Sequence, residues 1–223
     1  MLGVLVALGI GEVADSLRWD ARAKETVRSV RAEWAQNSGV FEERVLVQPC
    51  LDRRLAELKS IVRKARQFGR IPNLKQIGRP PVRPVTTDSW KQVTASEVLL
   101  HIDTEQSRLF TAGYTQVERY ASNVLLETDM WASLRVLEGN SGTISETLLA
   151  DTATTLARLE DKSSQNSLVA KQEFDSSRSL GIPTSYFLLL DREGSRAEAF
   201  RQLRNRPICK ALIVDGEPFV VAT

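Results

Sequence analysis

Residues 103–134 read DTEQSRLFTAGYTQVERYASNVLLETDMWASL, and this stretch predicts the clearest helix of the chain. Its apolar residues recur at steps of three or four positions or their sums, which places them on one helix face; they are Phe110, Tyr114, Val117, Ala121, Val124, Trp131 and Leu134. Asp103 followed by Gln106 is typical of a helix start. A face of about nine turns indicates a long helix in a mostly α fold.

A second apolar stripe runs from Val27 to Ala65 and predicts another long amphipathic helix. Two features interrupt this stripe. Asn37-Ser38-Gly39 could form a turn, and Pro49 removes a helix hydrogen bond. The pattern fits either one kinked helix or two helices in series, and we expect one helix bent near Pro49.

A third helix is expected from Ile144 to about Leu180, after a turn at residues 140–142. Thr143 and Glu146 form a capping-box pattern at its start, and Gly181 with Pro183 supplies stop signals. This helix is less apolar than the others. Its polar residues could line a ligand cavity, or they could face solvent beside one narrow buried stripe; they are Thr152, Thr155, Ser163, Asn166, Ser167 and Gln172.

The remaining segments are shorter. Residues 69–87 contain four prolines and predict a linker or a long surface loop, after which Thr86-Thr87-Asp88 can cap a shorter helix. Ser195 and Glu198 predict a brief helix. Asp215-Gly216 lies between two β-prone segments and predicts a hairpin, although Pro218 weakens it.

Together these patterns predict a mostly α protein. We expect an antiparallel bundle of long helices, packed as in coiled coils, with a small C-terminal α/β or hairpin appendage. The expected division is an apolar segment at residues 1–11, a bundle at 12–181 that contains the basic proline-rich linker 69–87, and the appendage at 182–223.

Residues 1–11 read MLGVLVALGIG and contain no charged or polar side chain. This is half of the ~20 apolar residues that a membrane-spanning helix requires. A secretory signal is not indicated, because no basic residues precede the apolar run and no cleavage site follows it. Gly3, Ala7 and Gly11 form a small-residue stripe that is typical of close helix packing in membranes.

The segment Gly3-Val4-Leu5-Val6-Ala7-Leu8, followed by Trp19 and a charged helix, resembles the end of the N-terminal transmembrane helix in bacterial envelope proteins of unassigned function. Those proteins carry a G-[IV]-L-[IV]-A-L segment and then a helical region. The resemblance covers roughly the first 35 residues. It implies a membrane anchor and no activity, and it predicts that the natural start lies upstream of Met1.

Charge excludes some classes of partner. The net charge is +2, so nucleic acid or lipid cannot be attracted by the molecule as a whole. Between residues 58 and 87, however, lie eight basic residues and no acid; they are Lys59, Arg63, Lys64, Arg66, Arg70, Lys75, Arg79 and Arg83. We call these residues the basic strip. We expect it to pair with residues 97–161, whose local charge is −7; anionic lipid headgroups are the second interpretation, and nucleic acid is disfavoured.

No catalytic pattern is present. The chain lacks a nucleophile elbow, a P-loop, a dinucleotide-binding motif and a zinc-protease motif, so no cofactor, metal or enzymatic activity is predicted. The single histidine, His101, is expected at a helix end with a structural hydrogen bond. The neighbouring acids Glu42-Glu43 and Glu160-Asp161 are expected on solvated helix faces.

Cys50 and Cys209 are the two cysteines, and each follows a proline closely in an apolar context. In the periplasm we expect them to form a disulfide that contributes roughly 5 kcal/mol before any strain is subtracted. In the cytoplasm both would be buried thiols. The expected function is a non-enzymatic domain anchored at the bacterial inner membrane, and the alternative is a soluble helical interaction protein whose N-terminus packs in its own core. A protein partner, a small ligand and a homo-oligomer all stay open.

Overall fold

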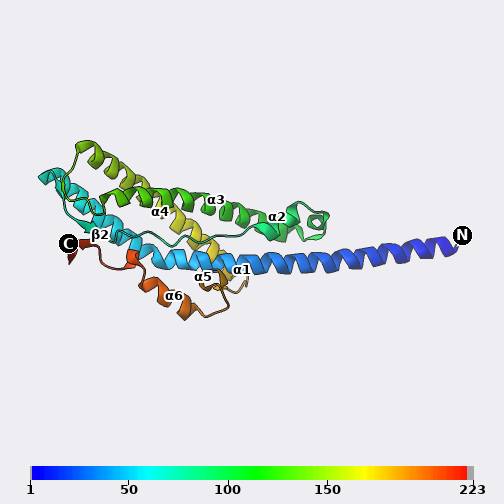
Figure 1. The fold of residues 1–223 in the computed structure, drawn as a ribbon. Coiled ribbons are helices and arrows are strands. Elements are labelled where there is room, and N and C mark those ends of the chain that lie inside the picture. The colour runs from blue at the N-terminus through cyan, green and yellow to red at the C-terminus, as the bar shows by residue number, and fades with distance from the viewer. Residues whose placement is uncertain (1, 220–223) are drawn as a thin grey trace.

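The structure is a computed structural model that describes the backbone of residues 2–219 and the side chains of residues 12–219. It is 74% helical, against an ordinary globular share of about a third. Three long helices, α1 (Leu2–Phe68), α3 (Thr104–Leu134) and α4 (Glu146–Ser179), lie along one another, and α4 runs antiparallel to the other two (Figure 1). The predicted mostly α bundle is therefore confirmed.

Helix α1 is a single helix of 67 residues, about 100 Å long at 1.5 Å per residue. It continues through Pro49, so the alternative of two helices in series is wrong. Its C-terminal part curves (Figure 1). Pro49 is tolerated inside the helix because its ring faces solvent and packing on either side holds the neighbouring turns.

The turn suggested by Asn37-Ser38-Gly39 is wrong as well, because these residues are helical and buried. Asn37 makes two hydrogen bonds to the backbone of Thr86, one from its Nδ2 (2.8 Å) and one to its Oδ1 (2.9 Å). A Cβ atom on Gly39 would lie 2.1 Å from the carbonyl oxygen of Ser185. These turn-forming residue types therefore allow two irregular segments to pack closely on α1.

Short elements join the long helices. The helix α2 (Asp88–Thr94) and the 3₁₀ helix η1 (Glu97–His101) precede α3, and the 3₁₀ helix η2 (Arg135–Leu137) follows it. The predicted start of α3 is confirmed, since Asp103 accepts a hydrogen bond from the Gln106 amide (2.9 Å). The predicted cap of α2 is not formed by its N-cap residue Thr87, whose side chain makes no capping hydrogen bond; Glu33 of α1 instead accepts a hydrogen bond from the Ser89 amide (2.9 Å).

The predicted cap of α4 is wrong by two positions. The N-cap is Ser145, whose Oγ accepts a hydrogen bond from the Leu148 amide (3.2 Å). Thr143 lies instead in a short strand, and the backbone there is occupied by strand pairing rather than by helix entry. The predicted stop is confirmed: α4 ends before Gly181, which adopts a positive φ of 61°.

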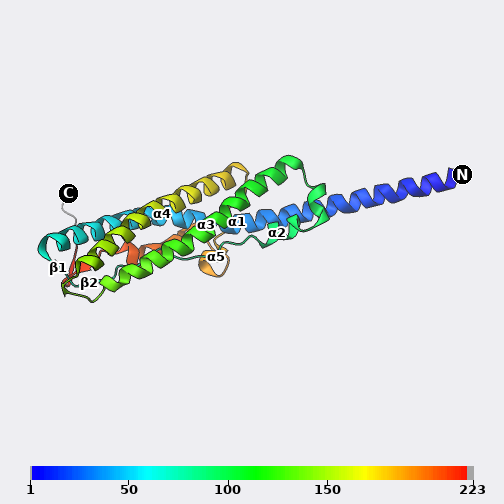
Figure 2. The ribbon, with the colours of Figure 1, turned by 90° about the horizontal axis from the view of Figure 1, so that it is seen from above.

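Two small antiparallel sheets close the bundle at one end. One pairs β1 (Arg70–Ile71) with β3 (Gly142–Thr143). The other has the order β2–β4–β5, formed by β2 (Leu74–Lys75), β4 (Ile213–Val214) and β5 (Glu217–Pro218). We call this the distal end of the bundle, because the N-terminal part of α1 extends from the opposite end (Figures 1 and 2).

The hairpin at Asp215-Gly216 is confirmed, and both residues have positive φ values, 51° and 92°. Pro218 is accommodated because β5 is an outer strand that needs no ladder hydrogen bond on its open side. The C-terminal region also contains α5 (Phe187–Leu190), α6 (Arg196–Arg204) and the 3₁₀ helix η3 (Pro207–Cys209). Ser195 caps α6 as predicted, accepting from the Glu198 amide (3.3 Å).

The proline-rich residues 69–87 are not a free linker. Their side chains Ile71, Leu74 and Ile77 are buried in the same core as Leu51 and Leu58 of α1. The appendage shares this core too, through the buried side chains of Leu203, Ile208 and Leu212. The linker expectation failed because prolines prevent a regular element without preventing apolar neighbours from packing.

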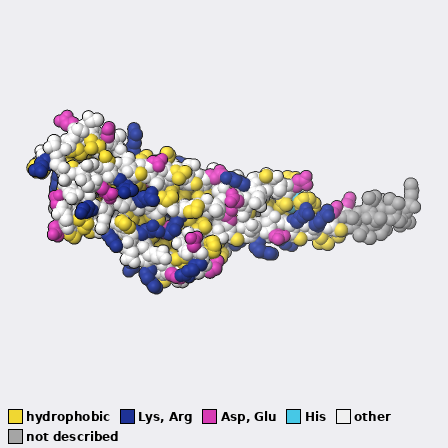
Figure 3. All heavy atoms as spheres, in the orientation of Figure 1, with side chains coloured by type: hydrophobic (Ala, Val, Ile, Leu, Met, Phe, Trp, Pro, Cys, Tyr) yellow, Lys and Arg dark blue, Asp and Glu magenta, His cyan; other side chains and the backbone are white. Residues whose placement is uncertain are grey.

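The N-terminal part of α1 leaves the bundle. Residues 12–18 are exposed, and the molecule narrows there from the bundle to one helix (Figure 3). We call residues 2–18 the stalk. The predicted packing stripe Gly3, Ala7 and Gly11 falls on residues whose side chains lie outside the description. Among the helices of the described chain, none has an apolar stretch long enough to cross a bilayer.

Candidate functional site

His101 lies at the end of η1 and is exposed. In the described chain its ring stacks on Trp19 of α1, with ring centroids 4.4 Å apart and an interplanar angle of 8°. The expected structural hydrogen bond is thus replaced by a stacking contact. This contact joins η1 to the base of the stalk.

The bundle interior contains a charged network. Arg44 Nη2 of α1 lies 3.0 Å from Glu127 Oε1 of α3, and both side chains are almost completely buried. Arg44 also donates to the backbone and side-chain oxygens of Ser163, and Asn166 donates to Glu127 Oε2 (2.6 Å). Each charge is compensated by its neighbours, as buried ions require.

This network decides the two interpretations of α4. Thr152, Ser163 and Asn166 are buried, so the interpretation that they face solvent is wrong. Gln172 is exposed, in agreement with that interpretation. The buried polar groups nevertheless bind protein side chains and backbone rather than surround a cavity. The interior is therefore a packed polar core.

Glu42 and Glu43 are also buried, so their expected solvated position is wrong. Glu42 accepts hydrogen bonds from the Tyr186 hydroxyl (2.8 Å) and from Arg196 (2.6 Å), and Glu43 pairs with Arg83 (3.1 Å). The sequence pattern failed here because α1 is covered on several sides at this level. Segments far away in the sequence supply the covering and the compensating charges.

Glu173 of α4 is buried without a charged partner in the described chain, and its Oε2 forms no hydrogen bond there. Burial raises the pKa of Glu173 to about 7, from an ordinary value of 4.5. The folded protein then binds more protons than the unfolded chain between these two values. Its stability must fall as the pH rises through this window.

We therefore expect Glu173→Gln to remove this loss of stability. At pH 8 the variant should be more stable than the wild type by about 3 kcal/mol, because each pKa unit corresponds to about 1.4 kcal/mol. At pH 4 the two proteins should be equally stable. Urea unfolding at both pH values measures this, with Asp161→Asn, an exposed site on the same helix, as the control. Equal stability of variant and wild type at pH 8 would contradict the assignment.

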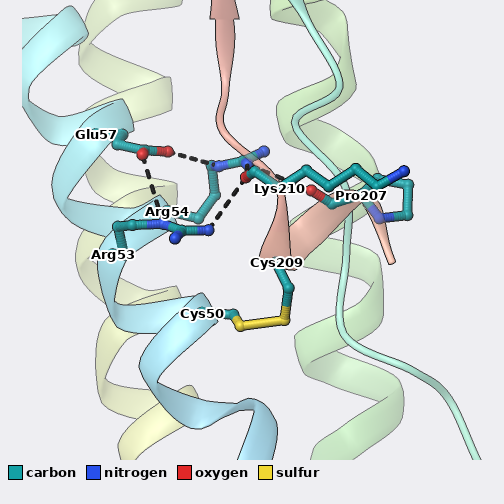
Figure 4. The surroundings of a disulfide bond; sticks show 7 residues. All are labelled: Cys50, Arg53, Arg54, Glu57, Pro207, Cys209 and Lys210. Atoms are coloured by element: carbon teal, nitrogen blue, oxygen red, sulfur yellow. Dashed lines mark hydrogen bonds and ion pairs between the residues drawn. A yellow bond between two sulfur atoms is a disulfide. The ribbon is translucent and has the colours of Figure 1, made fainter. Parts of the chain in front are cut away.

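Cys50 and Cys209 form a disulfide in the structure, with their Cα atoms 4.9 Å apart (Figure 4). The geometric condition for the predicted pairing is therefore met. The bond joins α1 to η3 across 159 positions of sequence. The oxidation state of this pair in the cell stays a prediction.

One turn of α1 further on, Arg54 is completely buried beside the disulfide (Figure 4). Its Nε donates to Glu57 (2.8 Å). Its other nitrogens donate to backbone carbonyl oxygens of two distant segments, namely those of Gln76 and Ile77 and, at η3, those of Pro207 and Lys210. Burial lowers the pKa of Arg54 below its ordinary value, and the neighbouring Glu57 carboxylate opposes this shift. We call the disulfide and Arg54 together the C-terminal joint.

The basic strip is divided by the fold. Lys59 pairs with Glu160 and Arg83 pairs with Glu43, so internal pairing holds for two residues, and only Glu160 belongs to the acidic segment 97–161. The six others are exposed, and none forms an ion pair within the described chain; they are Arg63, Lys64, Arg66, Arg70, Lys75 and Arg79. Most of the strip is thus free to meet an external anion.

A cleft of about 670 Å³ opens at the distal end. Lys64 and Arg70 of the basic strip line it, together with Asp215 and the turn at Ser141 and Gly142. Its apolar lining comes from the end of α1, β1 and the C-terminal region, namely Ile61, Phe68, Ile71, Pro72, Val214 and Phe219. The sequence analysis identified the cations but not the cleft, because the walls of the cleft come from three stretches that are far apart in the chain, residues 61–72, 141–142 and 214–219.

In the described residues, no group of three or more histidine, cysteine or acidic side chains is placed to hold a metal ion. No protein-family model, curated protein or solved structure matches this chain. The candidate site is accordingly defined by its geometry, as a cationic and partly apolar cleft.

Proposed function

We propose that this protein is a non-enzymatic, membrane-tethered envelope domain that holds a binding end away from the bilayer. The observation that carries the proposal is the continuity of α1. One helix, Leu2–Phe68, leads from the uncharged N-terminal sequence, past the exposed side chains of residues 12–18, to the distal cleft. An apolar helix end directed away from its own bundle is stabilised by lipid more than by water.

The length of α1 also bears on which partner the basic strip can contact. Trp19 and Phe68 are separated by about 70 Å of helix, whereas charge interactions are screened within about 8 Å at physiological salt. A bilayer that held residues 1–11 would lie too far from the distal cations to attract them. An anionic partner in solution or on another surface therefore fits better than headgroups of the anchoring membrane.

The Cα separation of 4.9 Å allows Cys50 and Cys209 to form a disulfide, and such bonds persist in the periplasm and are rare in the cytoplasm, so the placement of this pair favours an oxidising compartment. An anchor at the inner membrane with the bundle in the periplasm combines both features. The alternative, a soluble cytoplasmic protein, would have two free thiols and no membrane association.

Fractionation of bacteria that express the full-length protein from its natural gene tests the proposal. We expect the protein in the membrane fraction, degraded by protease added to the periplasmic side, without free thiols. Val6→Asp/Ile10→Asp should release it into the soluble fraction, because two carboxylates oppose insertion into lipid. Val13→Asp/Leu17→Asp, on the exposed stalk, is the matched control and should stay bound. Wild-type protein that is soluble, or protected from protease with free thiols, would overturn the proposal.

A further inference from the structure

The distal cleft is lined by both apolar and cationic side chains. Phe68, at the last position of α1, keeps 67% of its surface exposed. Ile61, Val214 and Phe219 continue the apolar surface from this ring into the cleft. The volume of about 670 Å³ lies within the range of sites for small organic ligands. The apolar part of a ligand of that size would cover the exposed ring of Phe68.

The free charge of the cleft is positive. Asp215 is the acidic residue of the lining. It lies in the hairpin turn, and its carboxylate accepts a hydrogen bond from the Asn73 amide (2.8 Å). Lys64 and Arg70 have no acidic partner in the described chain, and Lys64 Nζ lies 5.5 Å from the centre of the Phe219 ring. A cation is therefore held directly beside the apolar lining.

We propose that the distal cleft binds a small amphiphilic anion, a molecule with one carboxylate, sulfonate or phosphate group on an apolar body. The anionic group contacts Lys64 and Arg70, and the apolar body packs against Phe68 and its neighbours. This ligand class follows from charge complementarity beside an apolar surface. This inference rests on the proposed function and deepens it by naming the class of ligand that the distal end binds.

Two fluorescent probes with the same aromatic body test this ligand class. The sulfonate 8-anilinonaphthalene-1-sulfonate is expected to bind the full chain saturably, with one site per molecule. N-phenyl-1-naphthylamine lacks the sulfonate and should bind at least tenfold more weakly, because it cannot use the two cations. Fluorescence titration measures both affinities.

Matched variants locate the site. Lys64→Gln/Arg70→Gln should weaken binding of the sulfonate at least tenfold and leave the neutral probe unchanged. Lys75→Gln/Arg79→Gln removes the same charge from exposed positions outside the cleft and should change affinity less than twofold. Phe68→Ser should weaken both probes. All five positions are exposed, and circular dichroism checks that each variant retains its helices.

Equal sulfonate affinity in the two double variants, or no saturable binding to the wild type, would overturn the inference. These titrations use protein in solution and do not depend on residues 1–11. The anchoring experiment uses substitutions in those residues and leaves the cleft intact. A failure of the ligand class is thus distinguishable from a failure of the tether.

Discussion

Replacing Cys50 and Cys209 with alanine is expected to lower the free energy of unfolding by up to about 5 kcal/mol. The disulfide closes a loop across 159 positions, so in the chain-entropy model its loss gives the unfolded state much more freedom. The elements that follow it are short, and β4 and β5 have two residues each. Without the covalent bond, the C-terminal region is held by noncovalent contacts only, among them the buried side chains of Ile208 and Leu212.

Urea unfolding of Cys50→Ala/Cys209→Ala beside the wild type measures the effect. Wild-type protein in reducing buffer is the internal control and should match the variant, because both lack the covalent bond. Thiol titration of the denatured wild type without reductant should find no free thiol. Equal stability of oxidised and reduced wild type would refute a stabilising role for the bond.

Arg54→Met is expected to cost about 4 kcal/mol, in the range of changes that leave a buried charge unpaired. The methionine fills part of the space but donates no hydrogen bond. Glu57, itself buried, would lose its close partner, and four backbone carbonyl oxygens would lose a donor. Because two of these carbonyls belong to residues 69–87 and two to the C-terminal region, both segments should loosen.

Arg53→Met is the matched control. Arg53 is the neighbouring residue and its side chain is 46% exposed, so its contacts with Glu57 (3.6 Å) and the Lys210 carbonyl (3.1 Å) are screened by water. We expect its loss to cost less than about 1 kcal/mol. Thermal and urea unfolding compare the two variants, and hydrogen exchange should show faster exchange around Ile77 only in Arg54→Met. Equal costs for the two arginines would exclude a special role for Arg54 in the C-terminal joint.

The long helices could be predicted from the sequence because their information is local. Apolar residues three and four positions apart on α3 identify a buried face, and Asp103, Ser195 and Gly181 mark ends through groups that lie within one turn. The hairpin at Asp215-Gly216 is equally local, since two adjacent residues with positive φ define it. The cysteine pair could be suggested because the chain has two cysteines, but its geometry could not.

Tertiary structure alone decided which polar groups became core and where the cleft formed. The sequence pattern predicted a turn at Asn37 and Gly39 and a solvated helix face at Glu42 and Glu43. Distant segments cover all four residues, and they supply hydrogen bonds and opposite charges. The sequence pattern does not distinguish Arg54 from other helix arginines. Its hydrogen bonds to backbone carbonyl oxygens of two distant segments form only in the folded protein. The sequence by itself determined the elements, because helix periodicity, caps and tight turns depend on neighbours within a few residues. Burial of charge and the distal cleft depend on contacts between residues far apart in the chain, and those exist only after the helices have packed.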